Sequence, residues 1–250
     1  FSGNSAGAIV ALLLAVGYTP KEMTVELIQS RTLEKIRFPN LMSMVHGEGA
    51  MKLDPFEHWM ERMVINKIGT LPTFQELYEK FGKILYCSAY NMTDRRPEIL
   101  SYATTPDLSC VRGTIMSSSI PFIFKSPKYK GKEYIDGLVC DNLPFRMWNG
   151  KTKGILVIAC EEREDKLMEG TSTNDNFVNY ALEILSISRG ILTKRSLEDA
   201  KKHPGITLLL LNPKDKLSSL DFTASISRRL NLFSEGYSGA KIKFLSSKQI

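Results

Sequence analysis

Apolar residues at helical spacing mark the first third of the chain as mainly helical. The apolar run 8–16 directly follows a glycine-containing turn and predicts a buried helix. Residues 19–22 (TPKE) form a capping box with proline at the first helical position, which predicts a helix ending near Arg31. Further helices are expected from Asp54 and over 73–81. The helix from Asp54 has its large apolar residues on one face: Phe56, Trp59, Met60, Met63 and Val64.

Short apolar runs in the rest of the chain predict strands. Strands are expected at 84–90 and 98–103, joined by a turn, and at 134–135, just before an Asp-Gly pair. The fully apolar run 154–159 is typical of parallel strands that are buried on both faces, and 206–211 is expected to be another buried strand. Helices are expected between these strands at 106–118 and 176–202, and again from about residue 221.

The order of these elements predicts a single domain. No internal repeat or low-complexity linker interrupts the alternation of helices and strands. We therefore expect residues 1–250 to form one α/β domain, with a mixed, mainly parallel central sheet and helices on both of its faces. Residues 31–52 lack clear periodicity and contain a proline and glycines, so we expect a loop or lid there.

The composition is that of an ordinary globular protein. The chain has 250 residues, of which 43% are hydrophobic and 24% charged. No stretch reaches the roughly 18 apolar residues of a membrane span. The net charge of +6 is mild and compatible with attraction to an anionic lipid surface, whereas no nucleic-acid-binding motif is present. Because the chain opens with Phe1 in the middle of a motif, we expect it to be a fragment lacking its N-terminus.

The four cysteines lack the spacing of a metal site. Cys87 and Cys160 lie in apolar, strand-like runs, so we expect reduced, buried thiols and a reducing, cytoplasmic compartment. No cluster of carboxylates resembles a calcium-binding loop. Neither a metal nor a cofactor is therefore expected.

Residues 3–7 (GNSAG) spell G-x-S-x-G immediately before the first apolar run. This arrangement is the sequence form of a nucleophile elbow, in which a serine lies on a sharp turn between a strand and a helix. Glycine is needed where a side chain would collide with the neighbouring backbone. Ser5 is thus the candidate nucleophile, and the amide of Ala6, at the start of the helix, is a candidate oxyanion donor.

A serine nucleophile needs a base, and two candidates remain open from the residues alone. Of the three histidines, only His203 has the chain order of a Ser-Asp-His triad, but it lies between a helix and a strand, where a solvated helix end is expected. His46 and His58 are expected in a loop and on a helix surface. The other candidate is Asp136, which ends a short strand and precedes Gly137.

Three motifs in the right order resemble the patatin-like phospholipase family. They are the elbow at 3–8 (GNSAGA), the segment 117–124 (SSSIPFIF), which is similar to the family's S-S-x-x-P-x-x-F, and the Asp-Gly element at 136–144 (DGLVCDNLP), which is similar to D-G-[GA]…N-x-P. The resemblance covers residues 1–160 well and 161–250 loosely. It implies a three-layer α/β/α domain and a lipid acyl hydrolase that cleaves fatty-acyl esters of phospholipids.

The resemblance also implies roles for individual residues. Ser5 is expected to be the nucleophile and Asp136 its base, in a dyad without histidine. A partly apolar site that raises the pKa of the carboxyl group would suit such a base. Residues that support the motifs are Gly3, Gly7, Gly137, Asn142 and Pro144. An apolar groove for the acyl chain has six candidate residues: Ile9, Leu12, Met116, Ile120, Phe122 and Phe124.

Two departures from the family pattern are present. The family's glycine-rich oxyanion loop precedes its elbow, and no such loop occurs in these residues, so the chain is expected to be a fragment of an active enzyme or the remains of an inactive one. Leu138 stands where the family has glycine or alanine. Two alternative functions remain: an esterase that uses His203, and a non-catalytic lipid- or protein-binding relative.

A cluster of lysines suggests contact with a membrane surface. Four lysines lie in a short predicted hairpin just before Asp136: Lys125, Lys128, Lys130 and Lys132. Near an anionic membrane each would contribute about 1 kcal/mol. We expect a soluble protein with peripheral membrane contact, with the alternative of a merely solvated hairpin.

Overall fold

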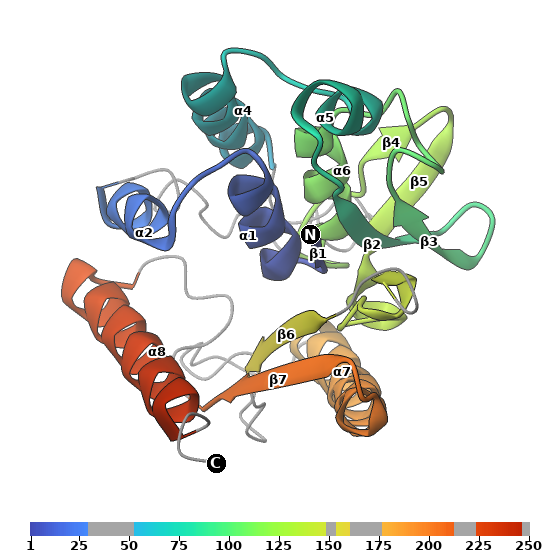
Figure 1. Ribbon diagram of the computed structural model, residues 1–250. Helices are drawn as coiled ribbons and strands as arrows, with labels where there is room; N and C mark the ends of the chain where they lie inside the picture. The colour runs from blue at the N-terminus through green and yellow to red at the C-terminus, as the bar shows by residue number, and fades with distance from the viewer. Residues whose placement is uncertain (30–52, 149–153, 161–176, 213–223, 247–250) are drawn as a thin grey trace. The chain divides into compact units, whose positions relative to one another are not determined.

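The computed structural model describes residues 1–29, 53–148, 154–160, 177–212 and 224–246 (Figure 1). These residues belong to two compact units. The first runs from Phe1 to Pro144, except for Leu27–Gln29, which group with the second unit, Phe145–Ile250. The expectation of a single domain over the whole chain stays a prediction. Residues 31–52, expected to form a loop or lid, lie outside the described residues.

The helices of the first unit lie close to the predicted ranges, except that the helix expected at 106–118 begins only at Cys110. They are α1 (Ala6–Ala15), α2 (Pro20–Gln29), α4 (Asp54–Ile68), α5 (Phe74–Phe81) and α6 (Cys110–Ser117). The predicted capping boxes are present: Thr19 and Glu22 exchange hydrogen bonds at the start of α2, as do Thr73 and Glu76 at the start of α5. The apolar face expected for α4 is buried. Helix α1 packs against α6 (Figure 1).

The sheet of the first unit is mixed, as expected. It contains β1 (Ser2–Gly3), β2 (Tyr86–Asn91), β3 (Arg96–Leu100), β4 (Lys128–Tyr129) and β5 (Lys132–Asp136). Strand β1 is parallel to β2, whereas β2–β3, β2–β5 and β4–β5 are antiparallel. The expectation of mainly parallel pairing therefore does not apply to this sheet. Two of the antiparallel pairs, β2–β3 and β4–β5, are hairpins, and a tight turn joins only antiparallel strands. The third pair, β2–β5, joins segments that are distant in the chain.

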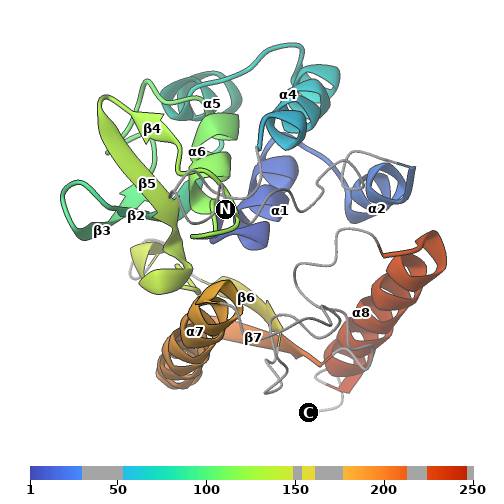
Figure 2. The same cartoon turned by 180° about the vertical axis from the view of Figure 1, so that it is seen from behind.

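The second unit contains a parallel pair of strands, as its sequence predicted. Strand β6 (Ile155–Cys160) pairs in register with β7 (Ile206–Leu211), and α7 (Phe177–Lys202) connects them. Figure 2 shows β6 and β7 side by side, and α7 contacts β7. Helix α8 (Ile226–Ser246) follows.

Burial in the second unit differs from the expectation. Val157 and Ala159 of β6 are buried, but Leu156 and Ile158, on the other face, are 52% and 56% exposed. Cys160, expected to be a buried thiol, is exposed, because it ends β6 on the same face as those two residues. Cys87 is buried in β2, as predicted.

Candidate active site

Ser5 lies at a sharp turn between β1 and α1. Its backbone has φ 53° and ψ −127°, a left-handed conformation that is strained for a residue with a side chain. Gly3 is required by this turn, because a Cβ atom there would overlap the carbonyl of Gly7 and the amide of Ala8. Gly7 is different, since no atom of the described residues lies within 4 Å of the position its Cβ would take. The local geometry is that of the predicted elbow.

The helix that follows begins directly after Ser5, and its amides from Gly7 to Ile9 bind the carbonyls of Asn4 and Ser5. Ala6 is the first residue of α1 and is exposed. The first amides of a helix have no acceptor within the helix and carry partial positive charge. The amide of Ala6 is therefore suited to an anionic oxygen near Ser5, and its role as an oxyanion donor stays a prediction.

Asp136 ends β5 and is completely buried. Its Oδ1 accepts a hydrogen bond of 2.8 Å from the amide of Leu138, in the short helical turn η2 (Gly137–Val139). Leu138 departs from the family pattern in its side chain, yet it is the backbone of this residue that orients the carboxylate. The Leu138 side chain is buried.

The topology of β2 brings the two motifs together. Because β3 pairs along one edge of β2, β1 and β5 must share the other edge. They run toward each other, with Gly3 opposite Cys87 and Asp136 opposite Ala89. At about 3.3 Å per residue, the two strands end roughly 7 Å apart, on either side of Ser88. The chain turns away from β2 at both ends of this gap.

The end of α6 anchors both turns. The amide of Ser5 donates to the carbonyl and the hydroxyl oxygen of Ser117, at 3.1 and 3.2 Å. The amide of Asp136 donates to the carbonyl of Ser119 at 2.9 Å. The segment 117–124 resembled the family on the basis of its sequence. In the structure its first three residues hold the backbones of both Ser5 and Asp136.

A buried polar network links the elbow to the loop after Asp136. The side-chain nitrogen of Asn4, Nδ2, donates a hydrogen bond to Oδ1 of Asn142 at 3.0 Å. The Ser88 hydroxyl approaches Oδ1 of Asn4 at 2.7 Å and the carbonyl of Asp141 at 3.0 Å. Gly137 packs so closely that a Cβ atom there would lie 2.5 Å from Oγ of Ser88.

Sequence reasoning named Asn142 and Gly137 as parts of a motif but missed Ser88. A single serine within an apolar strand has no local signal, because its partners come from segments 84 and 53 residues away.

The six residues proposed for an acyl groove divide into two groups. Leu12 and Met116 are fully buried and Phe124 nearly so, which places these three in the core. Ile9 and Ile120 are half-buried and Phe122 is exposed. The groove stays a prediction, and its accessible side would consist of these last three residues. Pro144 of the third motif is buried.

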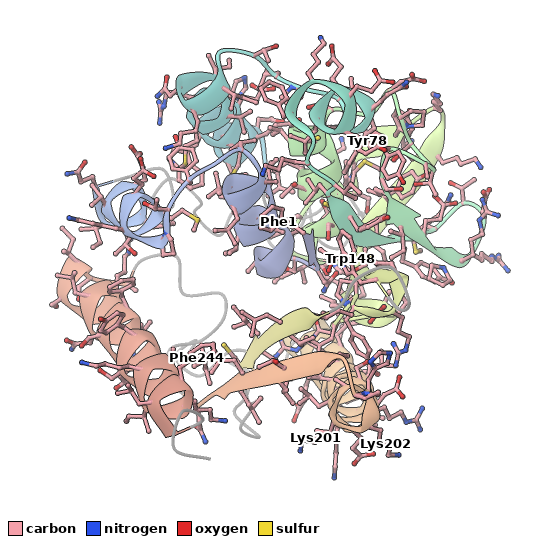
Figure 3. All side chains as sticks on the ribbon, viewed as in Figure 1. Phe1, Tyr78, Trp148, Lys201, Lys202 and Phe244 are labelled. Atoms are coloured by element: carbon pink, nitrogen blue, oxygen red, sulfur yellow. The ribbon has the colours of Figure 1, made fainter. Side chains whose placement is uncertain are left out.

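The histidines differ in their surroundings. His203 follows α7 in the second unit, next to Lys201 and Lys202, which Figure 3 shows at the end of that helix. Its Nδ1 accepts a hydrogen bond from the amide of Gly205, within the turn that leads to β7. This is the helix end that the sequence predicted. His58 is exposed on α4, as expected, and His46 lies outside the described residues.

The cysteines show no arrangement suited to metal or disulfide chemistry within the described ranges. Cys110 is buried like Cys87, and Cys140 is half-buried. Burial raises the pKa of the Cys140 thiol to about 11. The described part of the chain contains no group of three or more metal-ligating side chains. It also contains no helix with both the length and the apolar composition needed to cross a bilayer.

Strands β4 and β5 form a hairpin that contains three of the four predicted lysines, whereas Lys125 lies before β4. The turn of the hairpin has positive φ at Lys130 and Gly131, as a type I′ turn requires. Lys130 pairs with Asp107 at 3.2 Å and Lys132 with Asp94 at 2.6 Å. Lys125 and Lys128 are exposed and have no ion-pair partner among the described residues.

Comparison with known proteins identifies a family and several relatives of this chain. The family model for patatin-like phospholipase matches residues 1–147. Over 148 residues the chain is 37% identical to the probable lipid hydrolase 463L of Invertebrate iridescent virus 6, which covers 58% of this chain and 51% of that protein. It is 26% identical over 249 residues to the uncharacterized protein R571 of Acanthamoeba polyphaga mimivirus, which covers 96% of this chain and 80% of that protein.

A solved structure is also similar. The crystal structure of VipD from Legionella pneumophila aligns with a TM-score of 0.41 and 16% identity, over 95% of this chain and 60% of that one. The alignment with the viral lipid hydrolase, by contrast, spans about half of that protein's length. The family match covers more than half of this chain and includes all three motifs. The chain belongs to the patatin-like phospholipase family.

Proposed function

We propose that this protein is a lipid acyl hydrolase that cleaves fatty-acyl esters of phospholipids, with Ser5 as nucleophile and Asp136 as base. The observation that carries the proposal is the shared edge of β2, where β1 and β5 end head to head, with Ser5 two residues beyond the end of β1 and Asp136 at the end of β5. Family membership and the viral lipid hydrolase support the substrate class.

The chemistry follows from the two side chains. Asp136 takes the proton of the Ser5 hydroxyl as its oxygen attacks the ester carbonyl, and the carbonyl oxygen becomes an anion beside the Ala6 amide. Asp136 then returns the proton to the leaving alcohol, and an acyl-serine remains. Deprotonation of a water by Asp136 allows attack on this ester, which releases the fatty acid and restores Ser5.

Burial of Asp136 suits this role. A carboxylate that is completely buried is shielded from bulk water, which suits a transfer of the proton between it and a nearby hydroxyl. The hydrogen bond from Leu138 holds Oδ1, and so fixes the orientation of the carboxylate plane. The strained backbone of Ser5 keeps its side chain out of the helix and partly exposed.

The proposal includes peripheral contact with an anionic lipid surface through the β4–β5 hairpin. Lys125 and Lys128 are the residues that support it, because both are exposed and neither forms an ion pair within the described residues, although Lys128 lies opposite Glu133 in the hairpin. Lys130 and Lys132 are already paired, so they contribute less net attraction.

The test compares acyl release by full-length wild type, Ser5→Ala and Asp136→Asn on phosphatidylcholine vesicles and a soluble nitrophenyl ester. Both substitutions are expected to lower kcat at least about 1,000-fold, because they remove the nucleophile or its base. Ser126→Ala and Asp107→Asn are the matched controls, expected to keep full activity. His203→Ala is also expected to remain active.

A fluorophosphonate probe completes the test. It is expected to label wild type at Ser5 and to leave Ser5→Ala unlabelled. Wild-type turnover by Ser5→Ala would disprove the dyad, and loss of turnover in His203→Ala would favour a triad. A full-length protein that neither labels nor turns over would be the non-catalytic relative.

A further inference from the structure

Ser88 lies in the gap where the two catalytic turns leave β2. It is the residue between Cys87, the partner of Gly3, and Ala89, the partner of Asp136. Its side chain is 1% exposed. A buried hydroxyl in a strand core destabilises the fold unless it is hydrogen-bonded, so its partners are informative.

The hydroxyl of Ser88 has one proton to donate, and two acceptor oxygens lie within hydrogen-bond distance of it. The shorter contact, 2.7 Å, is to Oδ1 of Asn4, and the longer, 3.0 Å, is to the carbonyl of Asp141. One acceptor belongs to the residue before Ser5, and the other to the loop after Asp136. A single side chain on β2 thus binds both of the turns that carry the proposed dyad.

Asn4 extends this link. Its side-chain oxygen accepts from Ser88, and its side-chain nitrogen donates to Asn142. Its backbone carbonyl also accepts from the amide of Gly7, inside the elbow, at 2.8 Å. The residue that immediately precedes Ser5 is therefore held on three sides, and a change at Ser88 alters the position of the elbow.

Gly137 closes the gap from the other direction. A Cβ atom on Gly137 would overlap Oδ1 of Asn4 and lie 2.5 Å from Oγ of Ser88. The residue that follows Asp136 is therefore in direct contact with the Ser88 side chain. The backbone next to Asp136 therefore packs directly against Ser88 and Asn4.

We propose that Ser88 is a positioning residue that sets the separation of Ser5 and Asp136 through Asn4, Asp141 and Gly137. This inference rests on the proposed function, because Ser88 acts through the proposed dyad of Ser5 and Asp136. Ser88 does not touch the ester, so its loss is expected to change the rate of the chemical step rather than substrate binding.

The experiment measures kcat and KM on a soluble nitrophenyl ester for full-length Ser88→Ala and for Ser101→Ala. Ser101 is the matched control, a serine that is also 1% exposed and hydrogen-bonded, but after β3 and away from the dyad. Ser88→Ala is expected to lower kcat about 10- to 100-fold, with KM changed less than about 2-fold. Ser101→Ala is expected to keep wild-type kcat while it lowers the unfolding midpoint.

Asn142→Ala reaches the same network from its half-exposed end and serves where Ser88→Ala does not fold. This variant is expected to lower kcat with KM unchanged, because it removes the side-chain oxygen that accepts the hydrogen bond from Nδ2 of Asn4. Equal kcat for Ser88→Ala and Ser101→Ala, or wild-type kcat for Asn142→Ala, would overturn the positioning role. Failure of the dyad itself appears separately, as full activity of Ser5→Ala.

Discussion

At the scale of single residues, Gly3 and Gly7 occupy symmetrical places in G-x-S-x-G but meet different surroundings. Gly3 faces the backbone of Gly7 and Ala8, and backbone cannot move aside as a flexible side chain can. Gly7 lies in the first turn of α1, where its Cβ position is open among the described residues. The motif therefore contains one glycine required by packing and one that packing leaves free.

Gly3→Ala and Gly7→Ala are expected to have opposite effects on stability. Gly3→Ala should destabilise the fold by about 1–3 kcal/mol through overpacking. Gly7→Ala should be neutral, or stabilise by roughly 0.5–1 kcal/mol, because alanine favours the helix. Urea unfolding of both full-length variants measures the difference. Equal destabilisation by the two alanines would contradict the steric distinction.

The same scale shows why part of the site was predictable. Ser5, Asp136 and Asn142 lie in motifs whose spacing is visible in the sequence. Ser88 has no such mark, since its role arises only when β1 and β5 meet on one edge of β2. The anchoring carbonyls of Ser117 and Ser119 were equally hidden, because a backbone acceptor carries no residue signature.

At the scale of elements, α2 is connected to the end of α4 by one ion pair. Glu22 of the α2 capping box accepts from Lys67 at 2.8 Å, and the Lys67 ammonium also lies over the ring of Tyr18. The hydrogen bond from Lys67, with those from Thr19, lowers the pKa of Glu22 to about 2. The Glu22 carboxylate thus caps α2 and also binds Lys67 of α4.

Glu22→Gln is expected to lower the unfolding temperature at pH 7, and the effect should depend on pH. Because folding lowers the pKa of Glu22 from about 4.5, its stabilisation is complete above pH 4.5 and is lost as the pH falls toward 2. The difference between wild type and variant should shrink over that range. Thermal unfolding at several pH values measures it, with Glu26→Gln of the same helix as control. A constant difference would show that the charge is not responsible.

Helices and strands were not equally predictable. Capping boxes at Thr19 and Thr73 act over three residues, so their helices began where the sequence indicated. Strand order and direction depend on partners far along the chain, such as Ala89 and Asp136. Local periodicity cannot specify such a pairing, which explains why the antiparallel share of the first sheet was underestimated.

At the scale of the whole molecule, the net charge of +6 is too small to direct binding by itself, so the placement of lysines matters more. The double variant Lys125→Ala and Lys128→Ala is expected to weaken binding to phosphatidylserine vesicles by about 2 kcal/mol, which is roughly 30-fold. The matched control, Lys201→Ala and Lys202→Ala, removes the same charge from the end of α7.

Sedimentation with anionic and neutral vesicles measures this binding. The double variant of Lys125 and Lys128 should lose affinity for anionic vesicles alone, and the double variant of Lys201 and Lys202 should bind both kinds of vesicle as wild type does. Equal losses in the two double variants would mean that total charge, and not the β4–β5 hairpin, attracts the membrane.

The attachment of both catalytic turns to Ser117–Ser119 has a consequence for the geometry of the site. Three consecutive residues at the end of α6 therefore act as a common reference point for the backbones of Ser5 and Asp136. A substitution that displaced this segment would move both backbones together, whereas a change in either turn alone would alter their separation. Under the proposed function, the spacing of the dyad is thus set by the end of one helix as well as by the strands.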